Sequence, residues 1–378
     1  MSRRGPFTFY EFFCGGGMAR TGLGPDWTCL FANDVDAVKA QTYAANFGRD
    51  HLRVADVWDL RAGDLPGRAD LAWASSPCQD LSLAGARQGL SGSRSSAFWG
   101  FWALIEALDR QDRAPRAIGI ENVTGLLSSR GGADFTALCA ALAERGYHFG
   151  ALQIDAARFV PQSRPRLFVL AVRGPPPASF LDPSAGARME PVRRAFDRLP
   201  PALQARWLWW RLPHGVRRNA DLADLLEPDE AVAWLPAART QRLLALMAPV
   251  HRAKLDAAKA DGGRRVGALF RRMRVEAGKR VQRAEVRFDG LAGCLRTPTG
   301  GSSRQFIIVV EGQTVKARLV TGREAARLMG LPEDYLIPGR ATAALHLAGD
   351  GVAAPVVRCL AAHILEPLLG PTDKAAAA

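Results

Sequence analysis

Cysteine is scarce in this sequence, and its spacing is irregular. Only six of the 378 residues are cysteines, and no two of them form a CxxC pair. Disulfide frameworks and zinc sites both need clustered or regularly spaced cysteines. The sequence therefore predicts neither, and it favours a reducing compartment and a protein that holds no metal ion.

Long apolar runs and a signal-peptide layout are also lacking. No uninterrupted apolar stretch approaches the roughly 18 residues that cross a bilayer, and the first four residues, Met-Ser-Arg-Arg, lead directly into a Phe-rich stretch. We therefore expect a cytoplasmic protein without a membrane anchor. The apolar fraction of 48% and the charged fraction of 23% are ordinary for a globular chain, and the length suits one large domain with a smaller one.

Negative charge is in short supply, since the formal net charge is +13. Residues 251–289 hold 12 Lys or Arg against 5 Asp or Glu, which is a net +7 within one short stretch. Frequent use of Arg by a GC-rich genome would also give a basic chain, but it would spread the charge evenly. The local excess favours a polyanionic partner, because phosphates release condensed counterions when Lys and Arg bind them.

Short apolar strands alternate with amphipathic helices over residues 1–174. The predicted helices include 37–47, 98–108 and 135–145, and the predicted strands are Phe7–Phe13, Thr28–Ala32, Arg53–Val57, Leu71–Ser75, Ala117–Ile120, Phe149–Ile154 and Arg166–Val172. This alternation predicts an α/β fold with a mostly parallel, Rossmann-like sheet covered on both faces.

A glycine followed by three prolines, residues 174–177, ends that alternation. Residues 178–300 are rich in Arg, Ala, Leu and Trp without clear periodicity, and three of the tryptophans, Trp207, Trp209 and Trp210, suit the core of a smaller domain better than base stacking. Regular structure returns with a strand at Phe306–Val310. A helix then begins at a Thr321–Glu324 capping box and stops at Gly330.

These composition changes predict the domain boundaries. They indicate one boundary near residue 175 and another near residue 300, followed by an apolar segment at Leu345–Leu369 and a disordered tail at 373–378.

Chemistry-bearing residues follow the first three predicted strands. The first strand runs into the glycine turn Phe13–Gly17, where a ligand can approach the backbone and a helix N-terminus. The turn is not GxGxxG, which disfavours a nicotinamide cofactor. Asp34 and Asp56 end the next strands and suit ribose hydroxyls and an adenine amine, although either could simply cap a helix. A nucleoside-type cofactor that needs no phosphate cradle, such as S-adenosylmethionine, fits this set.

Cys78 follows the fourth strand in the sequence Ser75-Ser-Pro-Cys-Gln79. A cysteine behind a proline at the ligand edge of a sheet can be held near its thiolate form and aimed at an electrophile. A lone cysteine is more often a small buried residue. The Gly-, Ser- and Arg-rich residues 80–96 have the composition of a loop that closes over substrate. This composition favours the interpretation of Cys78 as a nucleophile over that of a buried residue.

The predicted strand Ala117–Ile120 leads to a candidate acid, and the predicted strand Arg166–Val172 begins beside two arginines that could bind anions. Glu121 emerges from an apolar strand, where desolvation can raise its pKa and suit it to donate a proton to a ring nitrogen; a surface carboxylate is the alternative. Arg164 and Arg166 flank Pro165 and present forked donors to carbonyl or phosphate oxygens.

In this order the motifs resemble those of the cytosine-C5 DNA methyltransferases. The matching segments are the Phe-x-Gly-x-Gly turn at 13–17, Asp34, Asp56, Pro77-Cys78-Gln79, Glu121-Asn-Val123, Gln162-x-Arg-x-Arg166, Arg318–Tyr335 and Gly349-Asp-Gly-Val352. They cover about two-thirds of the chain. Met18 stands where the family usually has another glycine, and Asp350 stands where it usually has asparagine, so cofactor affinity is open to change at both positions.

The resemblance implies a mechanism and a set of site residues. Cys78 would add to C6 of a flipped cytosine while Glu121 protonates N3, Arg166 holds O2 and Arg164 supports the pocket. S-adenosylmethionine would be the methyl donor, bound by Phe13, Cys14, Gly15, Gly17, Asp34, Asp56, Val57, Pro77, Asp350 and Val352.

The resemblance also places a basic target-recognition domain at 176–300, between the first part of a catalytic and cofactor-binding domain at 1–175 and a return to that domain at 301–372. It implies double-stranded DNA as substrate. The expected DNA contacts are Ser82, Arg94, Arg264, Arg265, Arg271, Arg272 and Arg274, with a solvated helical face as the alternative for these arginines. We further expect a monomer near the nucleoid and a possible cognate restriction endonuclease. A tRNA cytosine methyltransferase, a catalytically silent nucleic-acid-binding protein and a nicotinamide oxidoreductase are the alternatives.

Overall fold

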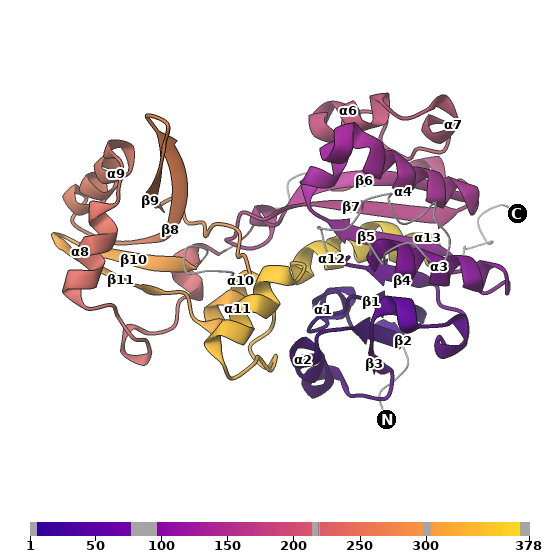
Figure 1. The fold of residues 1–378 in the computed structure, drawn as a ribbon, viewed down its shortest axis with the longest axis horizontal. Helices are drawn as coiled ribbons and strands as arrows, with labels where there is room; N and C mark the ends of the chain where they lie inside the picture. The colour runs from indigo at the N-terminus through magenta and orange to yellow at the C-terminus, as the bar shows by residue number, and fades with distance from the viewer. Residues whose placement is uncertain (1–5, 77–96, 214–217, 219, 298–303, 371–378) are drawn as a thin grey trace, which may run out of the picture. The chain divides into compact units, whose positions relative to one another are not determined.

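The computed structural model describes residues 6–76, 97–213, 218, 220–297 and 304–370. The chain divides into two compact units. The first comprises Met1–Ile154, Pro165–Gly215 and Val356–Ala378, and the second comprises Asp155–Arg164 and Val216–Pro355. Each unit is built around its own sheet (Figure 1).

The first unit is an α/β domain. Its strands are β1 (Phe7–Phe12), β2 (Trp27–Asp34), β3 (Leu52–Val54), β4 (Leu71–Ala74), β5 (Ala117–Asn122), β6 (Tyr147–Asp155) and β7 (Pro165–Arg173). Its helices are α1 (Met18–Leu23), α2 (Ala37–Phe47), α3 (Ala97–Asp109), α4 (Ala133–Glu144), α5 (Ala185–Arg188), α6 (Glu190–Asp197), α7 (Pro201–Gln204), α12 (Ala354–Leu360) and α13 (Glu366–Leu369).

The seven strands form one sheet in the order β3-β2-β1-β4-β5-β7-β6. Strands β1 to β5 are parallel to their neighbours, whereas β7 runs antiparallel to β5, with Glu121 opposite Phe168. The order reverses direction at β1, so that β2 and β4 lie on either side of it. Ligands of open α/β sheets bind at such a reversal, outside the carboxyl ends of the strands. The predicted α/β fold with a mostly parallel sheet is confirmed.

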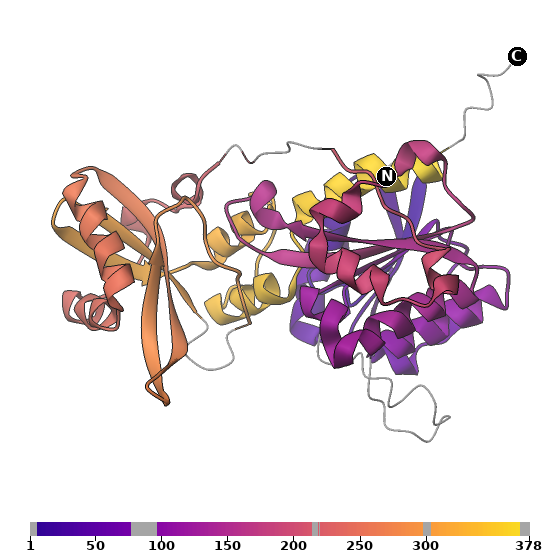
Figure 2. The same ribbon diagram turned by 90° about the horizontal axis from the view of Figure 1, so that it is seen from above.

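The core of the first unit lies between the sheet and its helices. Helix α3 contributes Phe98, Phe101 and Ile105, which are at most 1% exposed and follow the helical spacing predicted from the sequence. The yellow C-terminal helices and the purple α3 and α4 lie on opposite sides of the sheet (Figure 2). Trp207 and Trp210 are buried, but they pack in this first unit rather than in a smaller domain.

The second unit holds a four-stranded sheet in the order β11-β10-β8-β9. Its strands are β8 (Arg264–Glu276), β9 (Lys279–Arg287), β10 (Gln305–Glu311) and β11 (Thr314–Leu319), and its helices are α8 (Ala237–Ala245), α9 (Pro249–Ala260), α10 (Gly322–Leu328) and α11 (Ala341–Asp350). Leu243, Leu255, Leu269 and Ile308 are among the residues of its core. The predicted strand at 306–310 is β10, whereas β8, β9 and β11 were not predicted.

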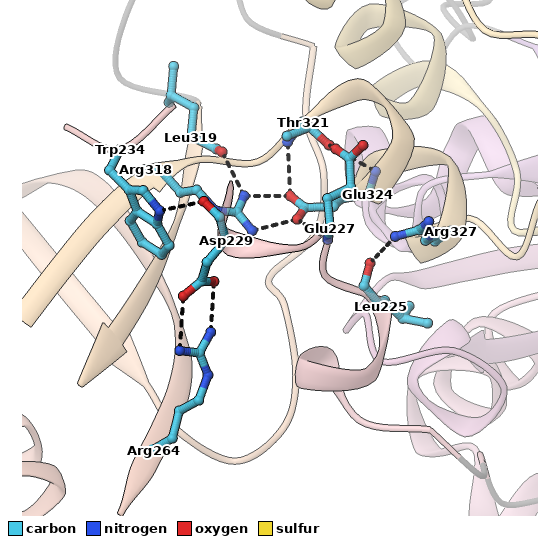
Figure 3. A network of polar contacts seen from close by, with 10 residues as sticks. All are labelled: Leu225, Glu227, Asp229, Trp234, Arg264, Arg318, Leu319, Thr321, Glu324 and Arg327. Carbon is cyan, nitrogen blue, oxygen red and sulfur yellow. Dashed lines mark hydrogen bonds and ion pairs between the residues drawn. The ribbon is translucent and has the colours of Figure 1, made fainter. Parts of the chain in front are cut away.

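A buried polar network ties α10 to this sheet (Figure 3). The side chains of Arg318 and Glu324 are each 1% exposed, and two guanidinium nitrogens of Arg318 donate to the Glu324 carboxylate at 2.8 and 2.6 Å. Glu324 also accepts from the backbone N–H groups of Thr321 and Glu227, each at 3.0 Å. The predicted capping box at Thr321 is therefore confirmed, and Gly330 follows the helix with a φ of 73°, which favours glycine.

The helical segment Ala341–Leu369 is long and apolar enough to meet a length-and-composition test for a membrane span, with a mean hydropathy of 1.5 in its most apolar window. The sequence analysis found no such segment, because it looked for an apolar run rather than for a high mean hydropathy over a longer window. More than half of that window is buried inside the protein, which is the pattern of a core helix.

The compact units differ from the predicted domains. Residues up to Gly215 stay with the first unit, and residues 301–355 belong to the second unit rather than returning to the first. The sequence change at 174–177 marks the end of β7 and the start of short helices that still belong to the first unit. The change in composition marks where the strand–helix alternation ends. The chain continues to pack in the first unit beyond that point, as far as Gly215.

Candidate active site

Functional candidates of the first unit lie along one edge of its sheet. In strand order, Asp34 ends β2, the turn Phe13–Gly17 follows β1, Ser76 follows β4, and Glu121 lies near the end of β5. Because β7 is antiparallel to β5, its first residues, including Arg166, lie at the same edge. Residues far apart in the sequence are thus brought together where a doubly wound sheet binds its ligands.

The glycine turn has a backbone that few residues can adopt. Phe13, Gly15 and Gly17 have φ values of 55°, 53° and 81°. A Cβ on Gly17 would lie 2.5 Å from the Phe47 ring, so only glycine fits there. A Cβ on Gly15 would meet nothing closer than a Lys39 carbon at 4.0 Å, so that position is open to a ligand. Strained turns of this kind are stabilised by their surroundings and cluster at functional sites.

Asp34 organises this turn. One carboxylate oxygen accepts the backbone N–H of Gly15 at 2.7 Å, and the other accepts the N–H of Asp36 at 2.8 Å. Burial raises the pKa of Asp34, and these two hydrogen bonds oppose that effect. Each carboxylate oxygen has a second acceptor site, so Asp34 remains able to accept from a ligand hydroxyl.

The remaining predicted cofactor residues of this unit have mixed roles. Asp56 caps the short helical turn Val57–Asp59 by accepting the Trp58 N–H at 3.0 Å, which is the alternative that the sequence left open. Val57 is 4% exposed. Cys14 lies within the glycine turn and is buried, and burial raises the pKa of its thiol well above the usual range. Cys14 therefore contributes backbone and packing rather than a thiolate.

Glu121 and Arg166 form an ion pair at the sheet edge. The Arg166 Nε lies 3.2 Å from a Glu121 carboxylate oxygen, and their side chains are 16% and 7% exposed. Each charge compensates the burial of the other, so neither is left unpaired in a poorly solvated place. The structure thus brings the predicted acid and the predicted O2-binding arginine into contact.

Asn122 anchors the segment that leads to the predicted nucleophile. Its side-chain N–H groups donate to the Ser76 backbone carbonyl and to the Ser76 hydroxyl, both at 3.2 Å, and Ser76 is 6% exposed. The sequence singled out Asn122 only as part of a motif and gave it no role. Pro77, Cys78, Ser82 and Arg94 lie outside the described residues.

Arg164 belongs to the second unit and is 1% exposed. It donates to the backbone carbonyls of Leu295 at 2.9 Å, Gly349 at 2.8 Å and Gly351 at 2.6 Å. The carbonyls of Gly349 and Gly351 flank Asp350, whose carboxylate accepts a hydrogen bond from the Thr297 hydroxyl. Arg164 is therefore a positioning residue for the segment 349–351. The roles of Asp350 and of Val352, which is 3% exposed, in cofactor binding stay predictions.

The arginines predicted to contact DNA lie on strand β8, not on a helical face. Arg264 donates to both carboxylate oxygens of Asp229 at 3.0 and 2.8 Å (Figure 3) and also pairs with Glu311. Arg265 donates to both oxygens of Asp261 at 2.6 and 2.9 Å. Both guanidinium groups are paired with carboxylates of the protein, but both side chains are exposed, so DNA contacts at these two positions stay predictions.

Three further predicted DNA contacts, Arg271, Arg272 and Arg274, lie in the outer half of β8. Arg272 and Arg274 pair with the same carboxylate, Glu285, and the Arg271 guanidinium lies 5.8 Å from the centre of the Phe306 ring.

A buried polar cluster behind the glycine turn was missed by the sequence analysis. Glu11, in β1, is 1% exposed, and Arg20 hydrogen-bonds the Tyr43 hydroxyl at 2.9 Å and contacts His51. Burial raises the pKa of Glu11 to about 8 and lowers that of His51 to about 4. The glutamate inside the apolar strand Phe7–Phe12 was the available signal. Among the described residues, no group of three or more His, Cys, Asp or Glu side chains is arranged to hold a metal ion.

The doubly wound sheet, the open glycine turn and the carboxylates at successive strand ends define an α/β domain of the kind that binds a nucleoside-type cofactor. The chain belongs to the family of C-5 cytosine-specific DNA methylases, whose model matches residues 7–366. Its enzyme class is therefore DNA cytosine-5 methyltransferase, and the resemblance seen in the sequence is confirmed.

Curated relatives span nearly the whole chain. The type II methyltransferase M.NlaX of Neisseria lactamica is 24% identical over 97% of this chain and 99% of its own length. The type II methyltransferase M.HpaII of Haemophilus parainfluenzae is 25% identical over 97% of this chain and 91% of its own length.

Solved structures share the fold. The Dnmt2 methyltransferase of S. pombe matches with a TM-score of 0.60 at 17% identity, over 96% of this chain and 99% of the other. A putative DNA modification methyltransferase encoded in an E. coli prophage matches with a TM-score of 0.56 at 16% identity, over 96% and 99% of the two chains. At such identities these matches bear on the fold alone.

Proposed function

We propose that this chain takes a cytosine out of duplex DNA and methylates C5 through a covalent bond between Cys78 and C6. The observation that carries the proposal is the contact between Glu121 and Arg166, which lies beside the strand that leads to Cys78. An acid and an arginine side by side suit the N3 and O2 edge of a cytosine, which presents two adjacent acceptors.

The family uses S-adenosylmethionine as its methyl donor, and the first unit fits such a molecule. Gly15 leaves open space above the turn, and Asp34 and Asp56 offer carboxylates at the ends of neighbouring strands. Carboxylates suit ribose hydroxyls and an adenine amine, whereas a phosphate-bearing cofactor would need anion-binding donors. When bound, S-adenosylmethionine supplies the electrophilic methyl group that C5 takes up.

The chain's own residues then act on the pyrimidine ring. The thiolate of Cys78 forms a bond to C6 and breaks the C5–C6 double bond, while Glu121, which must take up a proton first, donates a proton or hydrogen bond to N3 and Arg166 holds O2. This addition makes C5 nucleophilic. Once C5 carries the methyl group, loss of the C5 proton and of the Cys78 sulfur restores the aromatic ring. Residues 80–96, which the sequence analysis expects to form a loop over the flipped base, lie outside the described residues.

Neighbouring residues hold this machinery in place. Asn122 fixes Ser76, two residues before Cys78, through two hydrogen bonds. The prediction that Arg164 acts at the substrate becomes a positioning role in this proposal, because three backbone carbonyls already accept its hydrogen bonds.

The test is transfer of a labelled methyl group from S-adenosylmethionine to nucleic acid. The wild type should label duplex plasmid DNA and not tRNA. Glu121→Gln should lower kcat by about 100-fold, which is a typical contribution of general acid catalysis, and Cys78→Ala should abolish transfer. Labelling of tRNA instead of DNA, or full activity of Cys78→Ala, would contradict the proposal.

The biological role of this methylation is inferred from the relatives of the chain. Several curated relatives are type II methyltransferases, so we propose that this chain modifies a defined DNA sequence, either beside a cognate restriction endonuclease or alone. A cytoplasmic monomer acting at the nucleoid, with residues of the second unit selecting the target, completes the proposal.

A further inference from the structure

The outer half of the β8–β9 hairpin is a two-stranded ribbon. Strand β10 pairs with β8 only from Arg264 to Phe270, so beyond that point β8 pairs with β9 alone. Residues 271–284, called the ribbon below, project past the rest of the sheet of the second unit (Figures 1 and 2). The turn at its tip, Ala277-Gly278, has φ values of 47° and 75°, as in tight hairpins whose twist matches their strands.

The ribbon is strongly basic. It carries six Lys or Arg residues against a single Glu. Clustered Lys and Arg attract polyanions and release condensed counterions when they bind phosphates, so a ribbon of this composition suits a partner with negative charge.

One face of the ribbon is neutralised from within. Directly opposed residues of an antiparallel pair share a face, which places Arg272 with Arg283 and Glu276 with Lys279 on this face. Arg283 donates to Glu276 at 2.7 Å, and both Arg272 and Arg274 pair with Glu285 at the base of the ribbon. Three of its four cations are thus held by carboxylates of the same hairpin.

The other face combines exposed apolar groups with an amide and two cations, Arg280 near the tip and Arg271 at the base, where its guanidinium lies over the Phe306 ring. Met273 lies opposite Gln282, and Val275 lies opposite Arg280. Met273 is 45% exposed and Val275 is 73% exposed, although the same face is buried nearer the sheet, where Leu269 and Ala284 are fully covered. Among the described residues, Arg280 has no ion pair or hydrogen bond from its side chain.

We propose that this second face, made by Met273, Val275, Arg280 and Gln282, enters the major groove of duplex DNA and selects the target sequence. The inference rests on the proposed function and assigns the recognition step to particular side chains. A two-stranded ribbon fits the major groove, which is about 12 Å wide.

The chemistry of these side chains matches base edges. An arginine fork recognises the two acceptors of guanine, a glutamine amide recognises the donor and acceptor of adenine, and apolar groups contact the thymine methyl. Arg280 and Gln282 are two residues apart on one strand, so both point to the same side of the ribbon.

The test compares two single-charge removals on the same strand. Arg280→Ala and Arg283→Ala each delete one arginine from β9, but on opposite faces. Steady-state methylation of plasmid DNA should show kcat/KM lowered by about tenfold or more for Arg280→Ala, through KM, and changed less than about threefold for Arg283→Ala, since a good bidentate base contact carries discrimination of that order. Bisulfite sequencing of plasmid DNA should show that Gln282→Ala relaxes the choice of base at one position of the site.

The outcomes separate this inference from the proposed function. If the wild type methylates no cytosine in DNA, the proposed function fails. If it methylates a defined site but Arg280→Ala and Arg283→Ala weaken activity equally, the ribbon acts only through general charge and the assignment of its face is wrong. The assignment also fails if the wild type sediments as a dimer that Val275→Asp dissociates without changing methylation. Equal thermal unfolding midpoints of the variants show that each change is local.

Discussion

Replacing Glu11 by glutamine should remove a large pH dependence from the stability of the first unit. Glu11 is 1% exposed in β1, directly before the glycine turn. One carboxyl oxygen accepts the Arg20 backbone N–H at 3.4 Å, and the other has no hydrogen-bond partner among the described residues. Burial raises the pKa of Glu11 from 4.5 to about 8, and Arg20 offsets this only in part.

The sign follows from where the proton is held. Between pH 4.5 and 8 the native state keeps the proton of Glu11 while the unfolded chain releases it, so the native state loses stability as the pH rises. The stability that the native state gains by holding this proton is fully present below pH 4.5 and is lost as the pH rises past 8. A shift of this size is worth about 5 kcal/mol over the whole range, at about 1.4 kcal/mol for each pKa unit. Glutamine keeps the shape of the side chain and cannot ionise.

Urea unfolding at several pH values between 5 and 9, followed by tryptophan fluorescence, tests this prediction. All tryptophans except Trp234 lie in the first unit, so the signal reports that unit. The free energy of unfolding of Glu11→Gln should rise relative to the wild type by several kcal/mol between pH 5 and 9. Glu144→Gln, the same change at an exposed position of α4, should run parallel to the wild type. Parallel curves for Glu11→Gln would refute the reasoning.

Three further changes test the site and its supports. Asp34→Asn leaves one acceptor for the Gly15 N–H and removes the charge, so the Kd for S-adenosylmethionine in isothermal titration should rise about tenfold or more; an unchanged Kd would contradict the role of Asp34. Asn122→Ala removes two hydrogen bonds to the residue before the Pro-Cys motif, so kcat should fall at least about tenfold with little change in cofactor Kd; a change in Kd alone would refute this. Arg318→Ala leaves Glu324 buried and unpaired and should destabilise the second unit by about 3–5 kcal/mol in thermal unfolding, whereas a loss under 1 kcal/mol would show that water reaches the pair.

The first unit could be predicted well because its signals are local. Short strands, glycine turns and strand-end residues such as Asp34 and Glu121 are read from a few neighbouring positions, and the parallel sheet then lines them up. The contact of Glu121 with Arg166 follows from the antiparallel pairing of β5 and β7, which is a tertiary feature that periodicity did not reveal.

Strand β8 of the second unit could not be predicted because its buried residues, Gly267, Ala268 and Leu269, follow one another without the alternation that marks a strand with one buried face. In the outer part of β8, Met273 and Val275 alternate with Arg272 and Arg274, but both faces are exposed, so the alternation there does not mark a buried face. The carboxylates that pair with these arginines could not be identified from the sequence either, since Asp229 lies 35 residues before its partner Arg264. Composition located the basic stretch correctly but could not tell paired arginines from exposed ones.

The attack of Cys78 on a cytosine is the central claim, and trapping tests it most directly. A duplex with 5-fluorocytosine at the methylated position should form an adduct that survives denaturation when S-adenosylmethionine is present, because fluorine at C5 cannot leave as a proton does. The wild type should form this adduct, and Cys78→Ala should form none. If the wild type methylates the normal duplex without ever being trapped, or if Cys78→Ala is still trapped, the sulfur of Cys78 is not the nucleophile.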